Sequence, residues 1–123
     1  MDKEQAIHSF WSGFDIPAYD ENSVPDGAQM PYITYNVSTG AIEDVVLLHA
    51  SLWYYDTSWA EITHKAHEIE AAVGGEGHVI IPIDNGRIFL TQGVPFAQRM
   101  MDEADSVIKR IYINVNAEFL TAY

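Results

Sequence analysis

The sequence contains no cysteine, which excludes disulfide bonds, thiolate metal sites and cysteine nucleophiles. Lysine and arginine are scarce, because 6 of them stand against 18 Asp and Glu, and the formal net charge is −12 in 123 residues. A surface so poor in cations cannot displace counterions from phosphates, so specific nucleic-acid binding is excluded. No apolar run approaches the roughly 20 residues of a membrane helix, and the start of the chain is too polar for a secretion signal. We therefore expect a soluble protein, made in the cytoplasm, with no membrane partner.

Large apolar side chains are abundant despite this charge. Hydrophobic residues make up 48% of the chain, with 3 Trp, 7 Tyr and 5 Phe. Acidic disordered segments lack such residues, so this chain folds. Its length predicts a single domain over residues 1–123.

Two helices are predicted from apolar residues that recur at helical spacing. The first covers residues 2–14, where Ile7, Trp11 and Phe14 share one face. The second follows Ser58-Trp59-Ala60-Glu61, which has the pattern of a capping box, and ends at Gly74-Gly75.

Strands are predicted from alternating, β-branched and aromatic segments. They cover residues 31–37, 45–55, 78–83, 87–91 and 107–119, and Asp84-Asn85-Gly86 joins two of them as a hairpin. Residues 15–30 and 92–106 are expected to be long connections. The order α-β-β-α-β-β-β predicts an α+β fold, a mostly antiparallel sheet of about five strands with two helices packed on one face. Both faces of segment 45–55 carry apolar groups, so we expect a helix on one face and a partner on the other.

Histidines do not form a recognisable metal site. His64 and Glu68 lie one turn apart on the second helix, but on the face opposite its apolar residues, and the second histidine of a zincin helix is missing. We therefore expect a solvated helix face there. His49, in the middle of a strand, is expected to be half-buried and hydrogen-bonded.

Acidic residues occur as adjacent pairs in loops, such as Asp20-Glu21, rather than at the separations that hydrolases hold in a concave site. Serine and threonine stand in no nucleophile-elbow context, and the glycines after residue 73 follow a helix instead of preceding one. The sequence thus predicts neither an enzyme nor a cofactor.

Interaction with other proteins is better supported. Tyr and Trp are favoured at interfaces, and Trp53-Tyr54-Tyr55 ends a predicted strand. Phe96 and two methionines flank Arg99 in an otherwise polar connection, where they are either tucked under the loop or offered to a partner. The candidate interface residues are Trp53, Tyr55, Phe96, Arg99, Met100 and Met101.

Several short motifs, in this order along nearly the whole chain, resemble the tail terminators of long-tailed bacteriophages, which are small tail-completion proteins. The motifs are Trp11-x-x-Phe14-x-x-x-Ala18-Tyr19, Val24-Pro25, Pro31-Tyr32-Ile33-Thr34-Tyr35, Ser58-Trp59-Ala60-Glu61, Pro95-Phe96-Ala97 and Arg110-Ile111-Tyr112-Ile113-Asn114.

This resemblance implies a structural virion protein without catalysis. Tail terminators form a ring, commonly of six subunits, that caps the head-proximal end of the tail tube, stops its polymerisation and docks onto head-completion proteins. The expected partners are therefore further copies of this chain, the major tail tube protein and a head-completion protein, and the expected location is the virion. DNA passes through the hole, for which an anionic lining is suited. Candidate lumen or rim acids are Glu43, Asp44, Asp102, Glu103 and Asp105.

Two other hypotheses remain open at this point. The second hypothesis is a head-completion or adaptor protein of the same virion, which has similar requirements. A small acidic α+β enzyme or ligand-binding domain is the third hypothesis, and it requires a pocket with converging polar groups.

Overall fold

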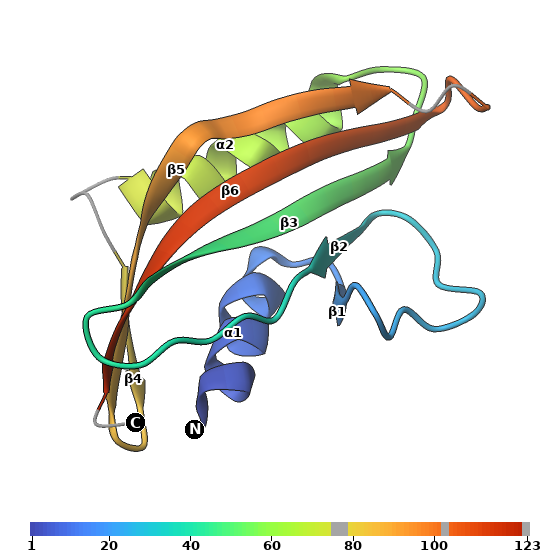
Figure 1. The fold of residues 1–123 in the computed structure, drawn as a ribbon. Coiled ribbons are helices and arrows are strands. Elements are labelled where there is room, and N and C mark those ends of the chain that lie inside the picture. The colour runs from blue at the N-terminus through green and yellow to red at the C-terminus, as the bar shows by residue number, and fades with distance from the viewer. Residues whose placement is uncertain (75–78, 102–103, 122–123) are drawn as a thin grey trace.

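Six strands form one curled sheet in the order β1-β2-β3-β6-β5-β4 (Figure 1). The computed structural model describes residues 1–74, 79–101 and 104–121. The strands are β1 (Ala18–Asp20), β2 (Tyr32–Tyr35), β3 (Val45–Tyr55), β4 (Val79–Ile83), β5 (Gly86–Met101) and β6 (Ile108–Thr121). Strands β1 and β2 run parallel, and every other neighbouring pair is antiparallel. The prediction of an α+β fold with a mostly antiparallel sheet is confirmed, although the sheet is mixed and has one strand more than expected.

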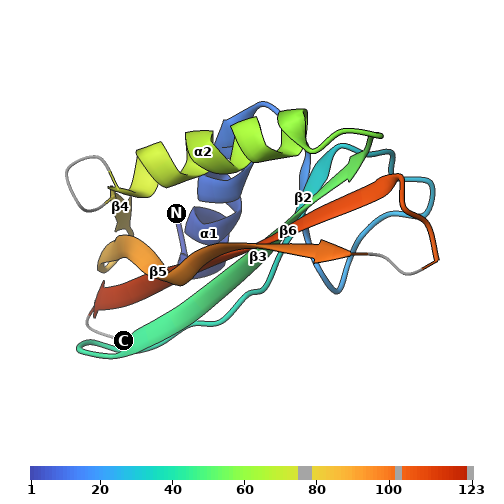
Figure 2. The same cartoon turned by 90° about the horizontal axis from the view of Figure 1, so that it is seen from above.

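Both helices lie on the same face of the sheet, which we call the inner face (Figure 2). Helix α1 (Lys3–Trp11) continues as a short 3-10 helix, Ser12–Phe14. Its N-terminus has a capping box in which Asp2 and Gln5 exchange side-chain and backbone hydrogen bonds. Helix α2 covers Ala60–Gly74. Neither described helix is long and apolar enough to cross a membrane.

The start of α2 departs in detail from the predicted capping box. The Ser58 hydroxyl accepts a hydrogen bond from the backbone N–H of Ala60, two residues on, at 3.0 Å. The expected bond would have reached Glu61, three residues on. The serine therefore stabilises the turn that leads into the helix, and the helix begins at Ala60.

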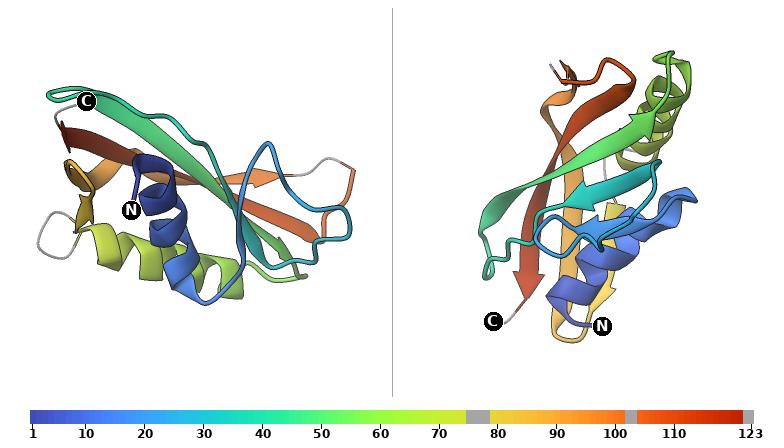
Figure 3. Two further views of the ribbon diagram at one scale, coloured as in Figure 1. Left: turned by 90° about the horizontal axis from the view of Figure 1, so that it is seen from below. Right: turned by 90° about the vertical axis from the view of Figure 1, so that its right-hand side faces the viewer.

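The sheet curls around α1, because this helix contacts both β1 and β4, the two edge strands. Figure 3 shows this curl from two sides. Helix α2 covers β3, β6 and β5 instead. The core lies between these layers, and its largest fully buried side chains are Trp11, Phe119, Ile33, Leu48, Leu52, Ile62, Ile69, Ile88, Leu90 and Ile113.

Two segments that were expected to be connections contain strands. Residues 92–101 continue β5 past a register shift between Gln92 and Ala97, and they pair with the first half of β6. Gly93 and Pro95 interrupt the alternating pattern at that bulge, which is why the sequence reads as a loop. Within residues 15–30, Ala18–Asp20 forms β1.

We expect Gly86→Ala to destabilise the protein. Gly86 has φ of 151°, a conformation that side-chain-bearing residues rarely adopt, and a Cβ atom there would collide with the backbone carbonyl of Leu120. The free energy of unfolding, measured by urea denaturation, should fall by about 2 kcal/mol. Gly13→Ala is the control, because no atom lies within 4 Å of the added Cβ. An equal loss in both variants would contradict the described hairpin.

Candidate functional site

The outer face of the sheet, opposite both helices, is not covered by any element of residues 1–74, 79–101 and 104–121. Along β3 the buried residues Leu48, Ala50 and Leu52 alternate with outward-facing ones. Large apolar side chains on this face stand in solvent: Val45 is 64% exposed, Leu47 53%, Tyr55 65% and Met100 39%. The helix predicted against one face of 45–55 is confirmed, and a partner on the other face stays a prediction.

A stack of aromatic and charged side chains occupies the middle of the outer face. The Arg110 guanidinium lies 4.7 Å from the ring centre of Trp53 and 5.9 Å from that of Tyr112. Tyr112 in turn stacks on His49 at 5.3 Å. The His49 ring contacts the Glu21 carboxylate at 3.3 Å, so this histidine is half-buried and hydrogen-bonded, as predicted. The stack joins β3, β6 and the segment after β1 into one surface.

The predicted interface residues divide between two places. Trp53, Tyr55 and Met100 lie on the outer face, and Trp53, Arg110 and Met100 form one row across β3, β6 and β5. The other three, Phe96, Arg99 and Met101, lie on the helix side of the far end of β5, which we call the β5 edge. Side chains alternate between the two faces of the strand, so Met100 points to the opposite side from Arg99 and Met101. These residues therefore lie in a strand rather than in a loop, and they do not form one cluster.

At the β5 edge, Arg99 is held against α2 and the turn before it. Its guanidinium lies 4.8 Å from the ring centre of Trp59 and donates to the Thr63 hydroxyl at 3.4 Å. Phe96 packs against the core, whereas Met101 is 82% exposed. A groove of about 330 Å³ runs between α2 and this part of β5.

The predicted lumen acids lie at opposite ends of the long strands. Glu43 and Asp44 precede β3, and Asp44 accepts a hydrogen bond from the Ala41 N–H at 2.9 Å. Asp105 lies before β6, beside the other end of β3, about 35 Å away by the length of that strand. Asp102 and Glu103 lie outside the described residues. Glu43 and Asp105 therefore face different ends of the molecule.

Most of the few Lys and Arg side chains contact backbone carbonyls or aromatic rings of the same chain. Lys3 and Lys65 each donate to a backbone carbonyl at 2.8 Å, those of Gly40 and Phe14. Lys109, which is buried, donates to the carbonyl of Ser106. Arg99 and Arg110 lie over indole rings. Lys65 also forms an ion pair with Glu68 at 3.3 Å. The surface is strongly negative because 18 Asp and Glu stand against 6 Lys and Arg.

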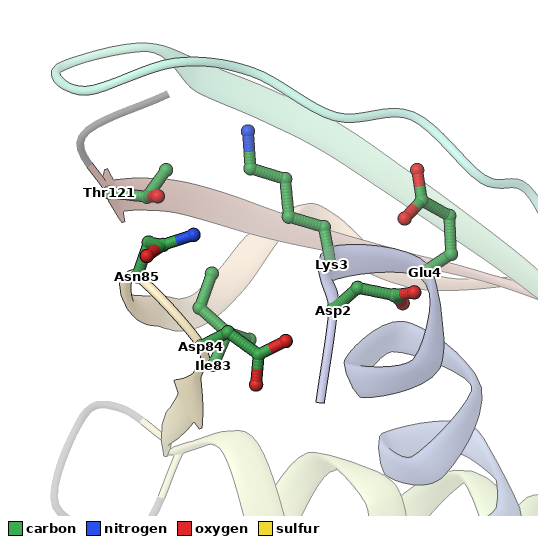
Figure 4. A pocket seen from close by; sticks show the side chains of 7 residues that line it. All are labelled: Asp2, Lys3, Glu4, Ile83, Asp84, Asn85 and Thr121. Carbon is green, nitrogen blue, oxygen red and sulfur yellow. The ribbon is translucent and has the colours of Figure 1, made fainter.

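Charged groups around the first helix serve the fold. A cavity of about 220 Å³ lies between the start of α1 and the β4–β5 hairpin, lined by Asp2, Lys3, Glu4, Ile83, Asp84, Asn85 and Thr121 (Figure 4). Asp2 caps α1, and Lys3 extends to the carbonyl of Gly40. In Figure 4 the carboxylates of Asp2, Glu4 and Asp84 point in different directions rather than at one point.

The histidines of α2 lie where the helical pattern places them. His64, His67 and Glu68 are exposed, so the prediction of a solvated helix face is confirmed. Among residues 1–74, 79–101 and 104–121, no three His, Asp or Glu side chains are grouped so that they could hold a metal ion.

Burial raises the pKa of two tyrosines. For Tyr54 the pKa is raised by burial and by the carboxylates of Glu61 and Glu68, and for Tyr35 by burial and by Asp20. Both phenols stay protonated through neutral pH, and the Tyr35 hydroxyl hydrogen-bonds His8 Nδ1 at 2.7 Å. These shifts belong to the packed inner side and mark no reactive group.

Sequence reasoning missed Arg110, Tyr112 and Glu21 as members of the outer-face stack. Arg110 and Tyr112 alternate with buried residues along β6, which places them outward, but their partners depend on the register with β3. Glu21 reaches His49 from 28 residues away. No local pattern in the chain signals that contact.

Comparison of the chain with protein-family models, with curated proteins and with solved structures finds no match. Function must therefore be inferred from the chain's own residues and geometry.

We expect Arg110→Lys to lower the free energy of unfolding by about 1 kcal/mol, because a lysine ammonium cannot replace the planar stacking of guanidinium on Trp53. The variant also loses the hydrogen bond from Arg110 Nε to the Ser51 hydroxyl, which measures 3.0 Å. Thermal and urea unfolding measure the change. Arg87→Lys, at an exposed position on the same face, is the control and should unfold like the wild type. Identical unfolding of both variants would show that the stack does not stabilise the outer face.

Proposed function

We propose that this protein is a structural virion component that forms a ring on the head-proximal end of a phage tail tube. The ring stops tube polymerisation and joins the tail to the head, and its partners are copies of itself, the tube protein and a head-completion protein. The order of short motifs along the chain, from Trp11-x-x-Phe14 to Arg110–Asn114, supports this proposal.

The uncovered outer face is the observation that carries the proposal. Val45, Leu47 and Tyr55 are each more than half exposed on one side of a sheet whose other side is packed. Val45 and Leu47 are neighbours at one end of this face and Tyr55 lies at the other end. Exposed apolar side chains on a sheet face that no described helix covers favour burial of that face in an assembly. An enzyme would be expected to concentrate its unusual groups in a cavity instead.

The charge distribution also favours a ring through which DNA passes. The net charge is −12, because 18 Asp and Glu stand against 6 Lys and Arg. A bore with this surface would repel phosphates and let the genome slide without binding. Glu43 and Asp44 at one end of the sheet and Asp105 at the other are the candidate lumen and rim acids.

A head-completion or adaptor role uses similar surfaces, and co-assembly separates the two. A terminator binds purified tail tubes at their ends, whereas an adaptor binds portal or head proteins and leaves tubes uncapped.

We expect the purified protein to form closed oligomers as its concentration rises and to cosediment with tail tubes. Leu47→Glu should abolish cosedimentation and leave the oligomer mass in light scattering unchanged, because it places a charge in the outer face that we assign to the tube. His64→Glu adds the same side chain on the exposed face of α2 and is the matched control, which should behave like the wild type. A wild-type protein that stays monomeric, both alone and with tubes, would overturn the proposed function.

A further inference from the structure

The far half of β5 is a strand edge without a described partner. Strand β4 pairs with β5 only from Gly86 to Leu90. Strand β6 pairs with it as far as Met101. Residues Ala97–Met101 therefore have β6 on one side and, within residues 1–74, 79–101 and 104–121, no strand on the other. Such an edge presents unpaired backbone N–H and C=O groups, which are a template for another strand.

Helix α2 forms a wall beside this edge. The groove between them, of about 330 Å³, has Ala66, Phe96 and Ile111 among its apolar lining residues. Its two ends differ in charge. Arg99 lies at the end near Thr63, and Glu70 lies at the end where its carbonyl accepts from the Gln92 amide at 3.2 Å. An unpaired strand edge beside a helix is the geometry with which proteins bind an extended segment as an added strand.

The opposite edge of the same sheet offers a segment that suits this groove. Among the strands of the described residues, β1 pairs with β2 alone, so its other side is the second edge of the sheet. Asp20, Glu21 and Asp26 make β1 and the residues after it acidic, and Glu21 and Asp26 are exposed. Their charge complements Arg99 at the near end of the groove, in a chain whose other surfaces would repel a second copy.

We propose that β1 and the following residues 21–26 of one copy dock on the β5 edge of the next copy, so that the sheet continues from subunit to subunit. This inference rests on the proposed ring and names the contact that closes it. The two patches are different and lie at opposite edges of one sheet, so the contact is head-to-tail and repeats around a closed ring. It leaves the outer face free for the tube and head proteins.

The absence of cysteine allows a direct test by cross-linking. The variant Asn22→Cys/Gln98→Cys places one thiol beside β1 and one at the groove, both at exposed positions of the full-length chain. With a short bis-maleimide, we expect denaturing gels to shift from the monomer to a ladder of covalent oligomers. Asn22→Cys/Asn85→Cys is the matched control, because Asn85 is exposed on the hairpin turn away from the groove. It should stay monomeric on the gel, as should each single variant.

Light scattering on the same samples before cross-linking separates the two proposals. Oligomers that persist without a ladder would overturn the edge-to-edge contact and leave the proposed ring intact. An equal ladder from the control pair would have the same meaning. Samples that show neither oligomers nor a ladder, both alone and with tail tubes, would overturn both.

Discussion

The pairing of β6 with β3 on one side and with β5 on the other is the constraint on which the rest of the structure depends. This strand of 14 residues sets the length of the sheet, and its inward side chains, from Ile111 to Phe119, form the floor of the core. Helix α2 packs on that floor, and α1 packs against the edge strands β1 and β4. The helices therefore cover the inner face of the sheet and leave the outer face uncovered. Strand β6 is also long enough to pair with the part of β5 that extends past β4. The two surfaces that we assign to assembly are both consequences of this one pairing.

The few cations fit the same scheme. Lysines that donate to backbone carbonyls, and arginines that lie over indole rings, stabilise loops and strands, but six cations are too few to balance 18 acids. Net charge of this size resists association between copies. A specific contact between copies must then bring local complementarity, and Arg99 beside the open edge of β5 supplies it. The same acidity suits a bore that carries DNA without holding it.

Much of the fold could be predicted from the sequence because its strongest signals are local. Strand 45–55 and the hairpin at Asp84-Asn85-Gly86 are confirmed, since alternation and turn chemistry act over a few residues. The continuation of β5 was missed because Gly93 and Pro95 break the period, although β6 still pairs with the residues beyond them. The stack of Arg110 on Trp53 depends on strand register, which no local pattern encodes. The candidate interface residues are exposed or half-buried, and their contact with a partner stays a prediction. Their division between two surfaces follows only from the alternation of a strand that was expected to be a loop.

The central claim is that copies of this chain close into a collar at the end of a tail tube. An electron-microscopic reconstruction of tubes incubated with the purified protein tests it most directly. The account predicts a closed ring at one end of the tube, with an open, acid-lined bore and the β5 edge of each subunit against β1 of its neighbour. Bare tube ends in the presence of excess folded protein, or a ring whose subunits enclose a positively charged channel, would contradict it.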